Sequence, residues 1–199
     1  MKKQSKLALA ILVAALLQIA GLHGSALELA ASAPDKPGKG VPSGDSNDNT
    51  IHGSAGWDTI YGYEGNDFIS GGDGNDTIDG GPGDDTIHGG AGADLLYGGS
   101  GNDKILGGIG EDTIFGDRGA DYILGGDGKD RIRGGPGNDI IYGGNGNDNL
   151  NGQEGDDILV GGPGRDSLIG GKGFDTCYVD PFDRHVDCEL VIRNSDKGD

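Results

Sequence analysis

A nine-residue period runs without insertion through most of this chain and limits its fold more than any other sequence feature. Fifteen copies of the pattern G-G-x-G-x-D-x-U-x, in which U is a large aliphatic residue, fill residues 44–178. Position 1 is glycine in all fifteen copies, and only Asn47 and Asn49 in the first copy depart from glycine at position 4 and aspartate at position 6. Position 8 carries Ile51, Ile60, Ile69, Ile78, Ile87, Leu96, Ile105, Ile114, Ile123, Ile132, Ile141, Leu150, Leu159, Leu168 and Cys177.

Each slot of the repeat has a physical role. Glycines at positions 1, 2 and 4 allow positive φ and close backbone approach, so the first half of each copy is predicted to be a tight loop. The x-U-x half suits a very short strand with one inward side chain. Two copies then complete an eighteen-residue coil, and copies i and i+2 stack on the same side. The prediction is an all-β, parallel β-roll of two sheets, with a thin core formed by the side chains at position 8 and two files of aspartates from position 6.

Composition alone is also consistent with a disordered chain. The 44 glycines and the 33% hydrophobic content are typical of a disordered, low-complexity chain. A disordered linker, however, has no physical reason to keep one aliphatic column in phase over fifteen copies. The strict periodicity therefore favours the roll.

These residues resemble the repeats-in-toxin (RTX) nonapeptide, the hemolysin-type calcium-binding repeat. The resemblance covers residues 44–178 and implies calcium ions between successive loops on each edge of the roll. It also implies ligands from position 6 carboxylates and from main-chain carbonyls of the glycine-rich loops. The aspartates that match are Asp58, Asp67, Asp76, Asp85, Asp94, Asp103, Asp112, Asp121, Asp130, Asp139, Asp148, Asp157, Asp166 and Asp175.

Ligand chemistry points to the same ion. Calcium accepts six to eight hard oxygens at flexible geometry, whereas zinc and copper prefer imidazole or thiolate. The only histidines, His23, His52, His88 and His185, have no ligand spacing. One aliphatic in each copy makes a weak core, and the formal charge of −18 opposes compaction. We therefore expect the chain to be largely unfolded without calcium and to fold cooperatively with it.

The amino terminus has the features of a secretory signal peptide. Lys2, Lys3 and Lys6 precede a 14-residue apolar stretch at residues 7–20, and small residues at 24–26 predict cleavage after Ala26. A second small-x-small site at residues 31–33 and an uncleaved anchor are the alternatives. Residues 1–26 are thus predicted to direct secretion, and residues 27–43, with three prolines, to form a flexible linker.

The carboxyl-terminal segment, residues 179–199, departs from the repeat and is expected to form a small cap over the last coil. Its apolar residues Val186, Leu190, Val191 and Ile192 are candidates to cover the core. In an exported chain, Cys177 and Cys188 most simply form one disulfide that joins the cap to the final coil. Two free thiols or an intermolecular bridge are the alternatives.

No catalytic motif is present. The chain lacks G-x-S-x-G, H-E-x-x-H and a Walker loop. The segment that begins at Asp45 resembles an EF-hand loop, but Thr50 and Gly56 stand where glycine and glutamate are required. Paired carboxylates such as Asp84–Asp85 span positions 5 and 6, so the first is expected to be a solvated neighbour of a ligand. The negative charge also disfavours nucleic acid as a partner.

Position 9 carries five aromatic side chains, Tyr61, Tyr97, Phe115, Tyr142 and Tyr178. Cross-strand packing on a sheet face is the favoured interpretation, and a platform for carbohydrate or another partner is the alternative.

Three functions differ in how well they fit these features. The favoured one is a secreted calcium-binding protein whose roll folds when calcium binds between the stacked loops. The second is an extracellular structural or adhesion module for a surface or polysaccharide partner, with purely structural calcium; its ice-binding form is disfavoured because the position 7 threonines are interrupted. The third, an enzyme, is disfavoured because the signal, linker and cap leave no room for a catalytic domain.

Overall fold

The computed structural model of the chain describes residues 43–193. The predicted signal peptide (residues 1–26), residues 27–42 of the linker and residues 194–199 of the cap lie outside the described residues. From residue 43 to residue 193 the regular secondary structure is entirely β. In that segment no helix is long and apolar enough to cross a membrane.

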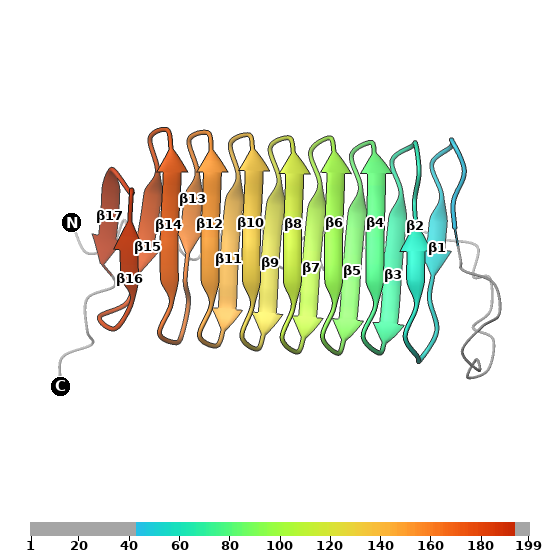
Figure 1. Cartoon of the computed structure of the whole chain (residues 1–199), viewed down its shortest axis with the longest axis horizontal. Helices are drawn as coiled ribbons and strands as arrows, with labels where there is room; N and C mark the ends of the chain where they lie inside the picture. Colours follow the sequence, from blue (N-terminus) through green and yellow to red (C-terminus); the bar gives the residue numbers. More distant parts are fainter. Residues whose placement is uncertain (1–42, 194–199) are drawn as a thin grey trace, which may run out of the picture. The chain divides into compact units, whose positions relative to one another are not determined.

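The strands form two sheets that alternate along the sequence, with odd-numbered strands in one sheet and even-numbered strands in the other (Figure 1). The first sheet contains β1 (Thr50–His52), β3 (Phe68–Asp73), β5 (Thr86–Ala91), β7 (Lys104–Ile109), β9 (Tyr122–Asp127), β11 (Ile140–Asn145), β13 (Ile158–Val160), β15 (Thr176–Val179) and β17 (Leu190–Arg193). The second contains β2 (Thr59–Tyr61), β4 (Thr77–Pro82), β6 (Leu95–Ser100), β8 (Thr113–Arg118), β10 (Arg131–Pro136), β12 (Asn149–Glu154), β14 (Ser167–Lys172) and β16 (Arg184–Val186).

Neighbouring strands in each sheet are parallel and come from copies i and i+2. In the pairing of β5 with β7, Ile87 lies opposite Ile105 and Gly90 lies opposite Gly108. The strands of the two sheets point in opposite directions in the view of Figure 1. The predicted all-β fold, a parallel β-roll with two copies in each coil, is therefore confirmed.

The core is a single column of side chains between the two sheets. The side chains at position 8 are buried in all fifteen copies and form one cluster, which Val179 joins. Ile51 in the first copy is the most exposed of them, at 7%, because no described coil covers it on its outer side. The predicted core is confirmed.

The strands are longer than the repeat pattern predicts. Eleven of them have six residues and extend through positions 1, 2 and 3 of the following copy, where a loop was expected. Gly90 and Ala91 in β5, for example, pair in register with Gly108 and Ile109 in β7. Because every regular coil has the same length, the glycine-rich segments stack as regularly as the aliphatic ones do.

The three glycine positions have different conformational roles. In most copies the glycines at positions 2 and 4 adopt positive φ, as Gly90 (122°) and Gly92 (139°) do, whereas the position 1 glycines are needed only for close approach. Where Tyr63, Asp117 and Gln153 replace the position 2 glycine, the backbone stays left-handed, with φ of 72°, 68° and 82°. Stacking therefore imposes the backbone conformation even where the residue disfavours it.

The carboxyl-terminal segment continues the coil. β16 pairs with β14, and β17 pairs with β15, so the cap adds one strand to each sheet. Of the four apolar residues predicted to cover the core, Val191 packs against it, whereas Val186 and Leu190 are exposed. The predicted disulfide between Cys177 and Cys188 is present, and neither cysteine is free.

Candidate metal sites

The position 6 aspartates lie immediately before the strands, at the ends of the glycine-rich loops. Those of odd-numbered copies follow one edge of the roll, and those of even-numbered copies follow the other edge. The side chains of thirteen are buried and at most 3% exposed, namely Asp67, Asp76, Asp85, Asp94, Asp103, Asp112, Asp121, Asp130, Asp139, Asp148, Asp157, Asp166 and Asp175. Asp58, in the second copy, is partly exposed.

One oxygen of each buried carboxylate has a defined structural partner. The backbone N–H of Asp94 donates to Oδ1 of Asp112 at 2.9 Å, and the same bond repeats along both files. The backbone N–H of Thr113 in turn donates to the carbonyl oxygen of Asp94 at 2.8 Å. The aspartate therefore joins consecutive coils through both its side chain and its main chain. An asparagine would accept the side-chain bond equally well, so this contact does not explain why position 6 is acidic.

The second oxygen of each carboxylate explains why position 6 is an acidic residue. In each of the thirteen buried aspartates, Oδ2 is inaccessible to water and has no hydrogen-bond partner within the described chain. Leaving a buried acceptor unsatisfied costs about 1–3 kcal/mol, and more when the group is charged. A column of such oxygens is therefore unfavourable unless each one meets a cation or takes up a proton.

A main-chain carbonyl lies beside this oxygen, because position 1 has no side chain. A Cβ atom on Gly107 would come within 2.5 Å of both Asp112 Oδ2 and the carbonyl oxygen of Gly125 in the next coil. Two acceptors thus converge at one place with no donor between them. Hard oxygens from carboxylates and carbonyls are the ligands that calcium prefers. No group of three or more His, Cys, Asp or Glu side chains is gathered anywhere in residues 43–193, so any metal site there needs main-chain ligands.

Burial shifts the acid–base equilibrium of both files. Desolvation is the largest cause, and it raises the pKa of Asp94 to about 6 and that of Asp103 to about 7. The backbone hydrogen bond to each carboxylate lowers the pKa, and neighbouring carboxylates of the same file raise it. Burial likewise raises the pKa to about 6 in Asp76, Asp85, Asp121, Asp157 and Asp166, and to about 7 in Asp130 and Asp139.

Acid is consequently expected to favour the metal-free roll. An aspartate with a raised pKa binds more protons in the folded chain than in the unfolded chain, where its pKa is near 3.8. This contribution to stability is complete below pH 3.8 and is lost as the pH rises through 6 to 7. In a chelator, circular dichroism between pH 7.5 and pH 4 should report a gain of β structure on acidification. A metal-free chain that gains β structure as the pH rises would contradict this expectation.

The position 6 residues of the first two copies, Asn49 and Asp58, have different hydrogen-bond partners from the thirteen buried aspartates. The backbone N–H of Asp45 donates to Asn49 Oδ1 at 2.7 Å, and that of Ser54 donates to Asp58 Oδ2 at 2.6 Å. Asn49 is neutral. Asp58 Oδ2 accepts hydrogen bonds from both the backbone N–H and the hydroxyl of Ser54, whose Oγ lies 3.1 Å away. All fourteen predicted aspartates thus lie in the two files, but only thirteen have a buried oxygen without a partner in the described chain.

Position 5 makes a contribution that the repeat pattern did not reveal. The backbone N–H of Asn102 donates to Asp84 Oδ1 at 2.7 Å, and that of Ala120 donates to Asn102 Oδ1 at 2.8 Å. These bonds run in the opposite direction to those of position 6, so they add a second side-chain link between the coils that they join. Asp84 is exposed, as expected, but it also anchors the next coil. The recurrence of Asn and Asp at position 5, mostly in odd-numbered copies but also at Asn75 and Asn147, is the sequence signal for this role.

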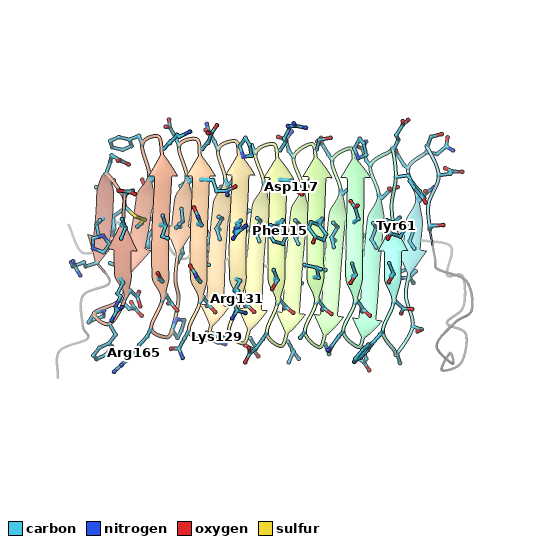
Figure 2. The ribbon with its side chains drawn as sticks, viewed as in Figure 1. Tyr61, Phe115, Asp117, Lys129, Arg131 and Arg165 are labelled. Carbon is cyan, nitrogen blue, oxygen red and sulfur yellow. A yellow bond between two sulfur atoms is a disulfide. The ribbon has the colours of Figure 1, made fainter. Side chains whose placement is uncertain are left out.

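Two of the position 9 aromatics, Tyr97 and Phe115, pack against each other across neighbouring strands. Tyr61 instead stacks on Tyr63, and Tyr142, in the other sheet, lies against Tyr122. The rings of Tyr97 and Phe115 are 5.0 Å apart and nearly parallel, with 8° between their planes. The guanidinium of Arg133 lies 5.5 Å from the ring of Phe115 on the same sheet face, where Figure 2 shows Phe115 near the middle of the roll. Phe115 thus packs against a side chain of each neighbouring strand, β6 and β10, so the cross-strand packing interpretation is supported for Tyr97 and Phe115.

The repeats match one protein family. A family model described as the RTX calcium-binding nonapeptide repeat, four copies long, matches residues 43–78, 70–105, 79–114, 106–141 and 142–177. The matched segments together span residues 43–177, which includes both files of aspartates. A comparison with curated proteins gave no significant match.

Proposed function

The chain belongs to the RTX calcium-binding nonapeptide repeat family, and on that premise we propose that it is a secreted calcium-binding protein whose roll forms as calcium enters its loops. RTX repeats fill a β-roll here, and this fold is a structural, calcium-binding one that is not typically catalytic. The proposal adds three elements to these facts, namely the ligands, the coupling of binding to folding, and export.

The proposed ligands are the position 6 carboxylates together with loop carbonyls. Thirteen buried carboxylate oxygens without partners in the described chain carry this assignment. When bound, calcium would supply a divalent charge that satisfies these oxygens and offsets the repulsion within each file. The residues proposed are Asp58, Asp67, Asp76, Asp85, Asp94, Asp103, Asp112, Asp121, Asp130, Asp139, Asp148, Asp157, Asp166 and Asp175, with Asp58 the weakest.

Coupling of binding to folding follows from the same oxygens. At pH 7 the carboxylates of the metal-free roll are buried either ionised or protonated. Protonation gives little stability at this pH, because even the raised pKa values of Asp103 and Asp130 are only about 7. An unfolded chain avoids both, because its aspartates are hydrated. Calcium binds the folded state and therefore shifts the equilibrium toward it.

Export is the third element. The lysines and apolar stretch of residues 2–20 support a signal peptide, and the Cys177–Cys188 disulfide is suited to an oxidising compartment. Outside the cell, weak cooperative sites would be filled by the calcium that is available there.

Replacing Asp112 by asparagine tests the ligand assignment. The amide keeps the acceptor for the Asp94 N–H, and it loses the negative oxygen beside the carbonyl of Gly125. In calorimetric titrations of the purified chain we expect Asp112→Asn to raise the calcium concentration at half-saturation by roughly tenfold. Asp73→Asn, an exposed change at position 3 with the same loss of charge, should leave the titration unaltered. Equal titrations for the two variants would refute the assignment.

A further inference from the structure

The two files of acidic residues continue beyond the fifteen copies, into the cap. The backbone N–H of Arg184 donates to the carbonyl of Asp166 at 2.8 Å, and that of Leu190 donates to the carbonyl of Asp175 at 2.9 Å. In the regular coils, the residue at position 7 makes the same bond to the aspartate one coil earlier. Arg184 and Leu190 also begin β16 and β17, in register with Ser167 and Thr176. Each therefore occupies position 7 of a further, irregular coil.

The residue before each of them then occupies position 6, and it is acidic. The backbone N–H of Asp166 donates to Asp183 Oδ1 at 2.9 Å, and that of Asp175 donates to Glu189 Oε2 at 2.8 Å. Asp94 and Asp112 make the corresponding bond, also at 2.9 Å, in the middle of the roll. Asp183 and Glu189 follow their partners by 17 and 14 positions in place of 18, and both lie outside the matched repeats.

The two aspartates that donate to these cap residues each have a buried oxygen without a partner in the described chain. Asp166 and Asp175 are 2% and 0% exposed, and the Oδ2 atom of each lacks a hydrogen-bond partner in the described chain. Burial is the largest cause of the raised pKa of Asp166, and Asp183 is the carboxylate that raises it most. Glu189 has the same effect on the pKa of Asp175, again after burial. The last interior carboxylates thus have an acidic neighbour on both sides, as earlier members of the files do.

The disulfide contributes to this arrangement. Cys177 is the core residue of the last regular copy, and Cys188 directly precedes Glu189. The cross-link therefore holds Glu189 against the coil that carries Asp175. Asp183 is held within the cap, because its Oδ2 accepts the backbone N–H of Asp180 at 2.6 Å, as Asp58 Oδ2 accepts that of Ser54 at the other end of the same file. Like Asp58, it is therefore the weaker of the two candidates.

We propose that Asp183 and Glu189 are calcium ligands that close one additional site in each file, between the last regular coil and the cap. The inference rests on the proposed function, since it assumes that the gaps between successive position 6 carboxylates are the calcium sites. Under this assignment the cap is the final part of the binding array.

The double variant Asp183→Asn with Glu189→Gln tests the proposal. Each amide keeps an acceptor for the backbone N–H of the preceding coil and removes the negative charge. Equilibrium dialysis of the purified, oxidised chain against calcium should show that the variant holds two fewer ions per chain than the parent. The charge-matched control Glu64→Gln with Asp73→Asn changes two exposed side chains at position 3 and should keep the parent count.

The outcomes distinguish the assignment of Asp183 and Glu189 from the proposed calcium-binding function. An unchanged count in the double variant would overturn the assignment of Asp183 and Glu189 and leave the proposed function intact. A parent chain that binds no calcium would overturn the proposed function itself. The single variants Asp183→Asn and Glu189→Gln each disturb one file and should each lose one ion. They preserve the test if the double variant does not fold, and an unchanged count in both would again overturn the proposal.

Discussion

In an excess of EGTA at neutral pH, the chain is expected to lose most of its β-sheet circular dichroism and to recover it when calcium is restored. Thirteen carboxylate oxygens are buried without a partner in the described chain, and they lie in files where each charge repels the next. The core that opposes this cost is one side chain wide. Removing the cations therefore leaves ionised groups in a low-dielectric setting, and unfolding is the route by which they regain water.

The recovery should be steep in calcium concentration, because each ion orders a loop that forms part of two neighbouring gaps. Magnesium at the same concentration should restore much less structure, since it requires a stricter octahedron of ligands. Far-ultraviolet circular dichroism through a calcium titration, with a parallel magnesium series, measures both effects. A magnesium curve that matches the calcium curve would show that charge neutralisation alone, without a site of defined geometry, drives folding.

Gly119→Ala is expected to be among the most damaging single substitutions in the roll. Gly119 is a position 4 glycine with φ of 138°, and a Cβ atom there would overlap the carbonyl oxygen of Gly101 one coil earlier. The obstacle is main chain, so no side-chain rotation relieves it. The left-handed backbone costs about 1–2 kcal/mol for alanine, and forced displacement of packed groups adds about 1–3 kcal/mol. We expect a loss of roughly 2–5 kcal/mol in urea unfolding at saturating calcium.

Gly56→Ala is the matched control. Gly56 is also at position 4, but it lies in the second copy, which no described coil precedes on the same edge. A Cβ atom there would meet only Ser54 Oγ, at 3.8 Å, and the backbone is not in the positive-φ region. The urea midpoint of this variant should stay close to that of the parent. If both variants unfold at the same urea concentration, close stacking of the position 4 backbone is not what limits stability.

The regular part of the structure could be predicted from the sequence because one physical rule repeats fifteen times. A fixed period places Ile78 above Ile60 and Asp112 above Asp94 whatever the variable residues are, so the coil, the core and both files follow. The period also places Cys177 in the core, whereas its pairing with Cys188 was predicted because these are the two cysteines of a chain that was expected to be exported. Repetition turns many weak local preferences into one strong constraint.

The nine-residue period could not predict residues that lie out of its frame, the direction in which a side chain points, or a backbone conformation that stacking imposes. Asp183 and Glu189 occupy position 6 of the irregular coil 17 and 14 positions after their partners, so a nine-residue frame excludes them. Asp84 was expected to be solvated, because a pattern does not show that its side chain reaches the next coil. The left-handed backbone of Tyr63 is equally invisible in the sequence, since it is imposed by the stacking of the coils.

Native mass spectrometry of the purified, oxidised chain is the most direct test of the claim that calcium holds the coils together. It reports on the same molecules both the number of bound ions and, through the charge-state distribution, whether they are compact. We predict two populations during a calcium titration, an extended one with few or no ions and a compact one that carries many, with little between them. A compact population that carries no calcium at neutral pH would contradict the claim.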